Sequence, residues 1–146
     1  MDPHPVISVT GTPLKGMKSG IIRGEVVKWK GPISFLGDVD PERGTLEKDG
    51  RRTDVSGKVL VFPEGAGSTV GSYVIYNLKL NGKAPLALVM SRADAIITIG
   101  CILADIPLVH GIEDELMNEI HTGDIIEMDP SSGRIRVFGK HEAEGK

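Results

Sequence analysis

Short, uninterrupted apolar segments in the second half of the chain limit its fold more than any other sequence feature. Residues 58–62 (KVLVF) and 86–90 (LALVM) have the length of strands and lack polar alternation, which is typical of strands buried on both faces. Between them, apolar residues recur at helical spacing and predict a helix over 69–80, which ends at Asn81-Gly82. This order of elements indicates an α/β unit with helices packed on a sheet.

The remaining segments predict further strands with few additional helices. Residues 95–99 and 108–109 are expected to be strands, with a helical turn over 100–105 and a short amphipathic helix over 114–120. Residues 124–128 and 134–138 are expected to pair as a hairpin across the turn between them.

The first half of the chain has weaker patterns. Residues 20–29 are rich in β-formers and predict a strand, 33–35 form a short apolar element, and 40–53 are expected to be a surface loop or mobile hairpin. We expect one domain over residues 1–146, in the mixed α/β class, with a β-sandwich or barrel-like body and packed helices. Residues 1–18 and 139–146 show no clear period and are expected to be flexible.

Composition excludes several classes of protein. The hydrophobic fraction of 40% and the charged fraction of 25% are those of a globular protein, and the net charge of −3 gives no support for nucleic-acid binding. The chain has no apolar run of membrane-spanning length and no signal-peptide pattern at its start, so we expect a cytoplasmic protein. A single cysteine, Cys101, excludes an internal disulfide and an iron–sulfur cluster held by this chain alone.

The segment Gly65-Ala66-Gly67-Ser68-Thr69 is the strongest candidate for a functional site. A strand that runs through a glycine loop into a helix brings unpaired backbone N–H groups to the positive end of the helix dipole, which suits an anion. Neither the spacing of a nucleotide-binding P-loop nor G-x-S-x-G is present. From the local pattern alone, Ser68 is more readily a structural helix N-cap than a catalytic residue.

Other candidate residues have structural interpretations. The histidines His4, His110, His121 and His141 lack metal-ligand spacing. Asp94 and Asp105 are expected to be caps or turn residues rather than an acid–base pair, and Cys101 is expected to be a small core residue.

Four segments, in matching order, resemble the small subunit of the aconitase X family, the detached swivelling domain of the aconitase superfamily. The resemblance spans about residues 20–138, and the serine loop is its most specific part. The matching segments are PEGAGSTVGSYV (63–74), PISFLGDVDP (32–41), NGKAP (81–85) and the stretch from Ala93-Asp94 to Ile106-Pro107.

The resemblance implies a swivelling β/β/α fold and a hydro-lyase activity that requires a large partner subunit. In the archaeal branch the reaction removes water from (R)-5-phosphomevalonate to give trans-anhydromevalonate 5-phosphate in a variant mevalonate pathway of isoprenoid biosynthesis. It implies that Ser68 is the proton acceptor and that the large subunit, not this chain, carries a 4Fe–4S iron–sulfur cluster. We expect Gly67 and Thr69 to bind the small anionic substrate, with Ser34 as a further hypothesis, because residues 33–35 and 65–69 are both glycine-flanked and contain small hydroxyl residues.

Three alternatives remain open at this stage. Other family members dehydrate cis-3-hydroxy-L-proline. Residues 57–138 also resemble the swivelling phosphohistidine domain of phosphoenolpyruvate-using enzymes, but no histidine occurs between residues 98 and 106, where that domain carries its phosphoryl group. A non-catalytic interaction module is the third alternative, and it requires that Ser68 be dispensable.

Overall fold

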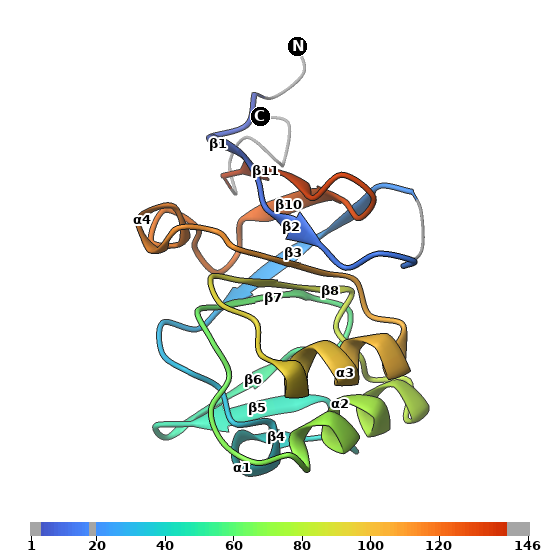
Figure 1. Cartoon of the computed structure of the whole chain (residues 1–146). Helices are drawn as coiled ribbons and strands as arrows, with labels where there is room; N and C mark the ends of the chain where they lie inside the picture. Colours follow the sequence, from blue (N-terminus) through green and yellow to red (C-terminus); the bar gives the residue numbers. More distant parts are fainter. Residues whose placement is uncertain (1–3, 18–19, 140–146) are drawn as a thin grey trace.

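The computed structural model describes residues 4–17 and 20–139, which form eleven strands and four helices (Figure 1). In chain order they are β1 (Ile7–Thr10), β2 (Thr12–Pro13), β3 (Ile22–Lys28), α1 (Phe35–Asp38), β4 (Val39–Asp40), β5 (Thr45–Lys48), β6 (Arg51–Asp54), β7 (Val59–Phe62), α2 (Gly71–Leu80), β8 (Ala87–Met90), α3 (Ala95–Ala104), β9 (Leu108–His110), α4 (Asp114–Met117), β10 (Ile125–Asp129) and β11 (Arg134–Phe138).

Eight strands form one sheet that curls until it almost closes. The strand order is β1-β11-β10-β3-β7-β8-β9-β2, and the four neighbours β3, β7, β8 and β9 are parallel. Strands β1 and β2 lie at opposite edges of this sheet, yet only Gly11 separates them along the chain. The two edges must therefore come together, which confirms the expected mixed α/β fold with a barrel-like body.

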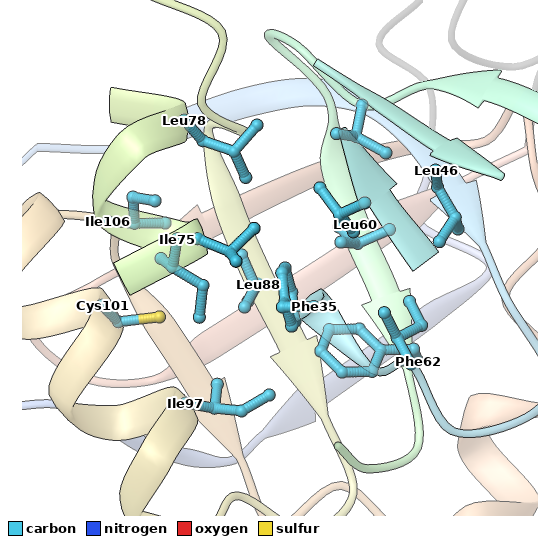
Figure 2. Close-up of a cluster of buried hydrophobic side chains, with 14 of the residues drawn as sticks. Phe35, Leu46, Leu60, Phe62, Ile75, Leu78, Leu88, Ile97, Cys101 and Ile106 are labelled. Atoms are coloured by element: carbon cyan, nitrogen blue, oxygen red, sulfur yellow. The ribbon is translucent and has the colours of Figure 1, made fainter. Parts of the chain in front are cut away.

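Two hydrophobic cores lie on opposite faces of the parallel strands. In β7, Leu60 and Phe62 enter the core beneath α2 and α3, whereas Val59 and Val61 enter the core against β10 and β11. Figure 2 shows side chains of the first core gathered between the helices and the sheet. All four residues of β7 and all four of β8 are buried, as the uninterrupted apolar segments predicted.

One predicted element is wrong in type. Residues 95–99, expected to be a strand, are the first half of α3. The side chain of Asp94 caps this helix by accepting a hydrogen bond from the Ile97 backbone N–H group at 2.9 Å. The run of β-branched residues favoured a strand, but a helix can bury such residues against a neighbouring helix equally well.

Two segments are more ordered than expected. Residues 40–53 contain a small antiparallel sheet, β4-β5-β6, whose Leu46 is fully buried in the first core. The segment 1–18 was expected to be flexible, but within it β1 pairs with β11 and β2 pairs with β9. These residues have no regular hydrophobic pattern, and hydrogen bonds to distant strands order them instead. The expected flexibility of 1–3 and 140–146 concerns residues outside the described part of the chain.

The helices are short. None in the described ranges has the length and apolar character needed to cross a membrane.

Candidate functional site

The candidate site lies where three parallel strands end. Strands β3, β7 and β8 run in one direction, so their carboxyl ends lie side by side at one end of the strands. The segments that follow them, 29–34, 63–70 and 91–94, then enter α1, α2 and α3 respectively (Figure 1). Crevices outside the carboxyl ends of parallel strands are the usual ligand sites of open α/β sheets.

Backbone hydrogen bonds hold these three segments together. Ile33 donates to the carbonyl of Glu64 at 3.1 Å, and Ala66 donates to the carbonyl of Ile33 at 3.0 Å. The carbonyl of Pro63 accepts hydrogen bonds from the N–H groups of Ser91 and Arg92, at 3.1 and 2.9 Å. The structure therefore brings residues 33–35, which contain the hypothetical substrate contact Ser34, next to residues 65–69.

Ser68 is half-buried in the loop before α2, but it is not the helix N-cap. The N-cap is Val70, which makes no side-chain cap hydrogen bond. Ser68 instead lies two residues earlier, where its Oγ accepts a hydrogen bond from the Val70 N–H group at 3.1 Å and its carbonyl accepts one from Gly71 at 3.0 Å. This local turn displaces the helix start and corrects the predicted cap.

The loop around Ser68 leaves donors unused. Within the described part of the chain, the backbone N–H groups of Gly67, Ser68 and Thr69 donate to no protein atom. Gly67 has a φ of 110°, and a Cβ atom there would lie 3.1 Å from the Oγ of Ser34. Consecutive free N–H groups before a helix are suitable donors for an anion, and the Ser34 hydroxyl lies beside Gly67.

Ser34 has a structural role that its sequence position did not reveal. It is the N-cap of α1, where its Oγ accepts a hydrogen bond from Gly37 at 3.2 Å and its own N–H group donates to Asp38 Oδ2 at 2.9 Å. The next residue, Phe35, is buried and packs edge-on against Phe62, with ring centroids 6.0 Å apart (Figure 2). Ser34 is thereby held on a rigid support at the rim of the loop.

Asp94 joins the site from α3, and sequence reasoning identified only its capping role. A Cβ atom at Gly65 would lie 2.9 Å from Asp94 Oδ2 and 2.8 Å from the Cδ1 atom of Ile97. Any larger residue at position 65 would have to displace these side chains, so glycine favours this close approach of the loop to the first turn of α3. The signal that could have located Asp94 is its position just after a buried strand whose parallel neighbour precedes Ser68.

These residues line a small, open pocket with a cavity volume of about 20 Å³. Among the described residues that line it, Asp94 is the only charged one, and none is a lysine, arginine or histidine. Ligand pockets usually enclose about 300–1,000 Å³, so this surface is one wall of a site rather than a whole site. The lining consists of Ile33, Phe35, Gly65, Ala66, Gly67, Ser68, Gly71, Asp94, Ile96 and Ile97.

The described residues do not fit a metal ion or a metal cluster. No group of three or more histidine, cysteine, aspartate or glutamate side chains in these ranges is arranged to hold a metal. Cys101 is buried in the first core, and this burial raises the pKa of its thiol to about 12.

The other candidates lie away from the pocket or are engaged in other contacts. His110 is the last residue of β9, where it pairs with Thr12 and does not line the pocket, and His121 is exposed beside Asp124. His141 lies outside the described residues. Asp105 ends α3 in a left-handed conformation, which confirms its predicted structural role.

A larger surface groove beside Trp29 contains several cations that already have partners. Lys28 donates to the carbonyls of Met117 and Ile120, and burial, followed by the charge of Lys30, lowers the pKa of Lys28. Two further cations in this groove, Lys48 and Arg51, contact Asp38 and the Trp29 ring respectively. The pocket beside Ser68 is the better candidate site because the free backbone donors of residues 67–69 lie there.

Comparison with known proteins identifies the relatives of this chain. The family model described as the aconitase X swivel domain matches residues 13–137. The phosphomevalonate dehydratase small subunit of Pyrococcus abyssi is 44% identical over 128 residues, which cover 86% of this chain and 96% of the relative. The protein of the same name from Thermococcus kodakarensis is 46% identical over 130 residues, with 86% and 96% of the two chains covered.

A solved structure agrees with these sequence matches. The crystal structure of Thermococcus kodakaraensis aconitase X in its holo-form superposes with a TM-score of 0.81 at 41% identity, and the match covers 90% of this chain and 98% of that chain.

Proposed function

Because the chain belongs to the aconitase X swivel domain family, we propose that it is the small subunit of a phosphomevalonate dehydratase. The complete enzyme converts (R)-5-phosphomevalonate to trans-anhydromevalonate 5-phosphate and water, and Ser68 of this chain is the proton acceptor. The observation that carries the assignment of Ser68 is its position in the pocket wall, with its Oγ accepting the N–H group of Val70.

The reaction removes a proton from the carbon next to the substrate carboxylate. In this step the C–H bond breaks, the proton is transferred to the alkoxide Oγ of Ser68, and the electron pair of that bond forms the new double bond as the C–O bond breaks. The departing hydroxide takes a proton from an acid of the large subunit to leave as water, and Ser68 then returns its proton to solvent. A serine Oγ accepts a proton only as an alkoxide, so the site must stabilise negative charge on oxygen. The Val70 N–H group already points at Oγ, and the start of α2 adds its positive dipole end.

The same loop suits the charge of the substrate. The free N–H groups of Gly67 and Thr69 are donors for an anionic group, and Ser34 adds a hydroxyl at the rim. We propose these three residues as substrate contacts.

A partner must complete the site. The pocket on this chain is small, and none of the described residues that line it is a cation, although the substrate is an anion. In the described residues the hydroxyl of Ser68 has no acceptor that could take its proton, so this chain does not supply the activating base. We propose that the large subunit provides the missing groups and holds the iron–sulfur cluster of the family, for which the described residues here have no ligand set.

Replacement of Ser68 tests this proposal. Ser68→Ala should lower kcat on (R)-5-phosphomevalonate by about 10²–10⁴-fold in the enzyme reconstituted with its large subunit, because a positioned proton acceptor contributes that range. The loss of one hydrogen bond to Val70 should cost about 1 kcal/mol of stability, so the variant should fold and assemble. Steady-state kinetics, gel filtration with the large subunit and a melting curve measure the three effects.

Two controls make the experiment specific. Ser8→Ala removes an exposed hydroxyl from β1, far along the sheet from the pocket, and should leave kcat and KM unchanged. A parallel assay on cis-3-hydroxy-L-proline tests the other substrate of the family. Near-normal turnover by the Ser68→Ala enzyme would show that Ser68 has only a structural role in the turn. Activity of the unmodified enzyme on cis-3-hydroxy-L-proline but not on phosphomevalonate would contradict the proposed substrate.

A further inference from the structure

Helices α2 and α3 present a large apolar surface that no other part of the described chain covers. The two helices pack side by side on the outside of the main sheet, below β7 and β8 in Figure 1. Each has three large apolar side chains on its outer side, between 37% and 64% exposed. The resulting α2–α3 face comprises Tyr73, Tyr76 and Leu80 of α2 with Ile99, Ile102 and Leu103 of α3.

The composition of α3 makes this exposure unusual. All ten residues of α3, AIITIGCILA, are uncharged, and α2 has one charged residue, Lys79. A helix at a permanent surface normally presents charged and polar residues on its outer side, whereas a helix that is apolar all round is buried. Patches of this kind on a globular protein mark interaction sites.

The α2–α3 face begins at the pocket. Gly71 of α2 and Ile96 of α3 both line the pocket, so both helices run away from it. Two further apolar residues continue the exposed surface at the pocket end: Leu36, which follows the pocket residue Phe35, is 51% exposed, and Val70, which precedes Gly71, is 44% exposed. A partner that closed the pocket would therefore also reach the start of this face.

We infer that the α2–α3 face is the docking surface for the large subunit, which covers both helices while it closes the pocket. The inference rests on the proposed function, because the pocket needs a second wall with cations. A second copy of this chain fits the observations less well. An isologous dimer through this face would place the copy beside the mouth of each pocket, where the large subunit must sit.

A single charge on the α2–α3 face tests the inference. Ile102→Lys places a lysine at an exposed position of α3, where the isolated chain tolerates it with little change in melting temperature. In the complex the ammonium group would be buried against apolar side chains without a counter-ion. We expect the Kd for the purified large subunit, measured by isothermal titration calorimetry, to rise by at least about tenfold. Turnover of phosphomevalonate should recover when the large subunit is added in excess.

Val6→Lys is the matched control. Val6 is 58% exposed, close to the 57% of Ile102, but it precedes β1 at the far end of the molecule. This variant should bind the large subunit with the Kd of the unmodified chain.

The outcomes separate the inference from the proposed function. If the unmodified chain does not bind the large subunit, the proposed function fails. If the unmodified chain binds and is active, and Ile102→Lys binds equally well, the proposed function stands and the docking surface is wrong. Sedimentation of the isolated chain adds a third arm: a dimer that Ile102→Lys dissociates, with large-subunit binding intact, would assign the face to a second copy and overturn the inference.

Discussion

At the scale of single residues, two serine hydroxyls lie at the pocket in different structural situations. Ser34 Oγ is engaged as the N-cap of α1, whereas Ser68 Oγ accepts one N–H group outside any helix. The capping interaction explains why a serine occupies position 34 without any reference to a substrate. A test of Ser34 must therefore separate capping from substrate binding.

Two substitutions at Ser34 make that separation. Ser34→Ala should lower stability by about 1 kcal/mol, since the Gly37 N–H group loses its acceptor, and should raise KM for phosphomevalonate if the hydroxyl binds substrate. Ser34→Asn keeps a good N-cap residue but removes the hydroxyl. We expect Asn to restore the melting temperature and leave KM raised. Recovery of both quantities with Asn would show that Ser34 acts only as a cap.

At the scale of elements, the packing of α3 against α2 explains why the segment after β8 is a helix rather than a strand. Gly100 lies against α2, where a Cβ atom would be 2.8 Å from the Cδ1 atom of Ile75 and 3.2 Å from the Cα atom of Ser72. Figure 2 shows Ile75, Ile97 and Cys101 between the two helices and the sheet. Glycine in mid-helix costs stability locally, but here it permits the close packing that buries the inner side of α3.

The crossing predicts opposite effects for two glycine-to-alanine changes. Gly100→Ala should destabilise the chain by about 1–3 kcal/mol, because the added methyl group overpacks a backbone contact and this outweighs the gain of about 1 kcal/mol in helix propensity. Gly71→Ala at the start of α2 meets its nearest atom at 3.5 Å and should be neutral or slightly stabilising. Urea unfolding of both variants measures the difference. A Gly100→Ala variant at least as stable as the parent would contradict the packing described.

At the scale of the whole molecule, the two cores share the same strands. Each of β7 and β8 contributes alternate residues to the first and second core, as Leu88 and Val89 illustrate. The edge strands β1 and β2 then join the two ends of the curled sheet through Gly11. Because β7 and β8 belong to both cores, unfolding of one core would also disrupt the other. The chain should therefore unfold as one cooperative unit.

Unfolding followed by two probes tests this coupling. The single tryptophan, Trp29, belongs to the first core, whereas far-ultraviolet circular dichroism reports all elements. The two denaturation curves should coincide. Ile126→Ala, which creates a cavity in the second core, should shift both midpoints together by an amount equivalent to about 2–5 kcal/mol. A tryptophan signal that is unchanged while the circular dichroism shifts would show that the cores unfold separately.

Several features of this protein were determined by local sequence. The uninterrupted apolar segments at 58–62 and 86–90 predicted strands that are buried on both faces, and the helical spacing of Val70, Val74, Ile75 and Leu78 predicted α2 to within two residues. These patterns depend on interactions between near neighbours in the chain, which a single sequence records. The glycine loop around Ser68 and its position before a helix were likewise predicted from local sequence.

Only the tertiary structure decided which segments meet. The parallel order β3-β7-β8 brings Ser34, Ser68 and Asp94 together at the carboxyl ends of these strands, although Ser34 and Asp94 are 60 positions apart in the chain. The same packing makes residues 95–99 helical, because α2 offers a surface on which α3 buries Ile97 and Cys101. Strand order and helix packing depend on contacts between distant residues, whose free energy no local pattern contains.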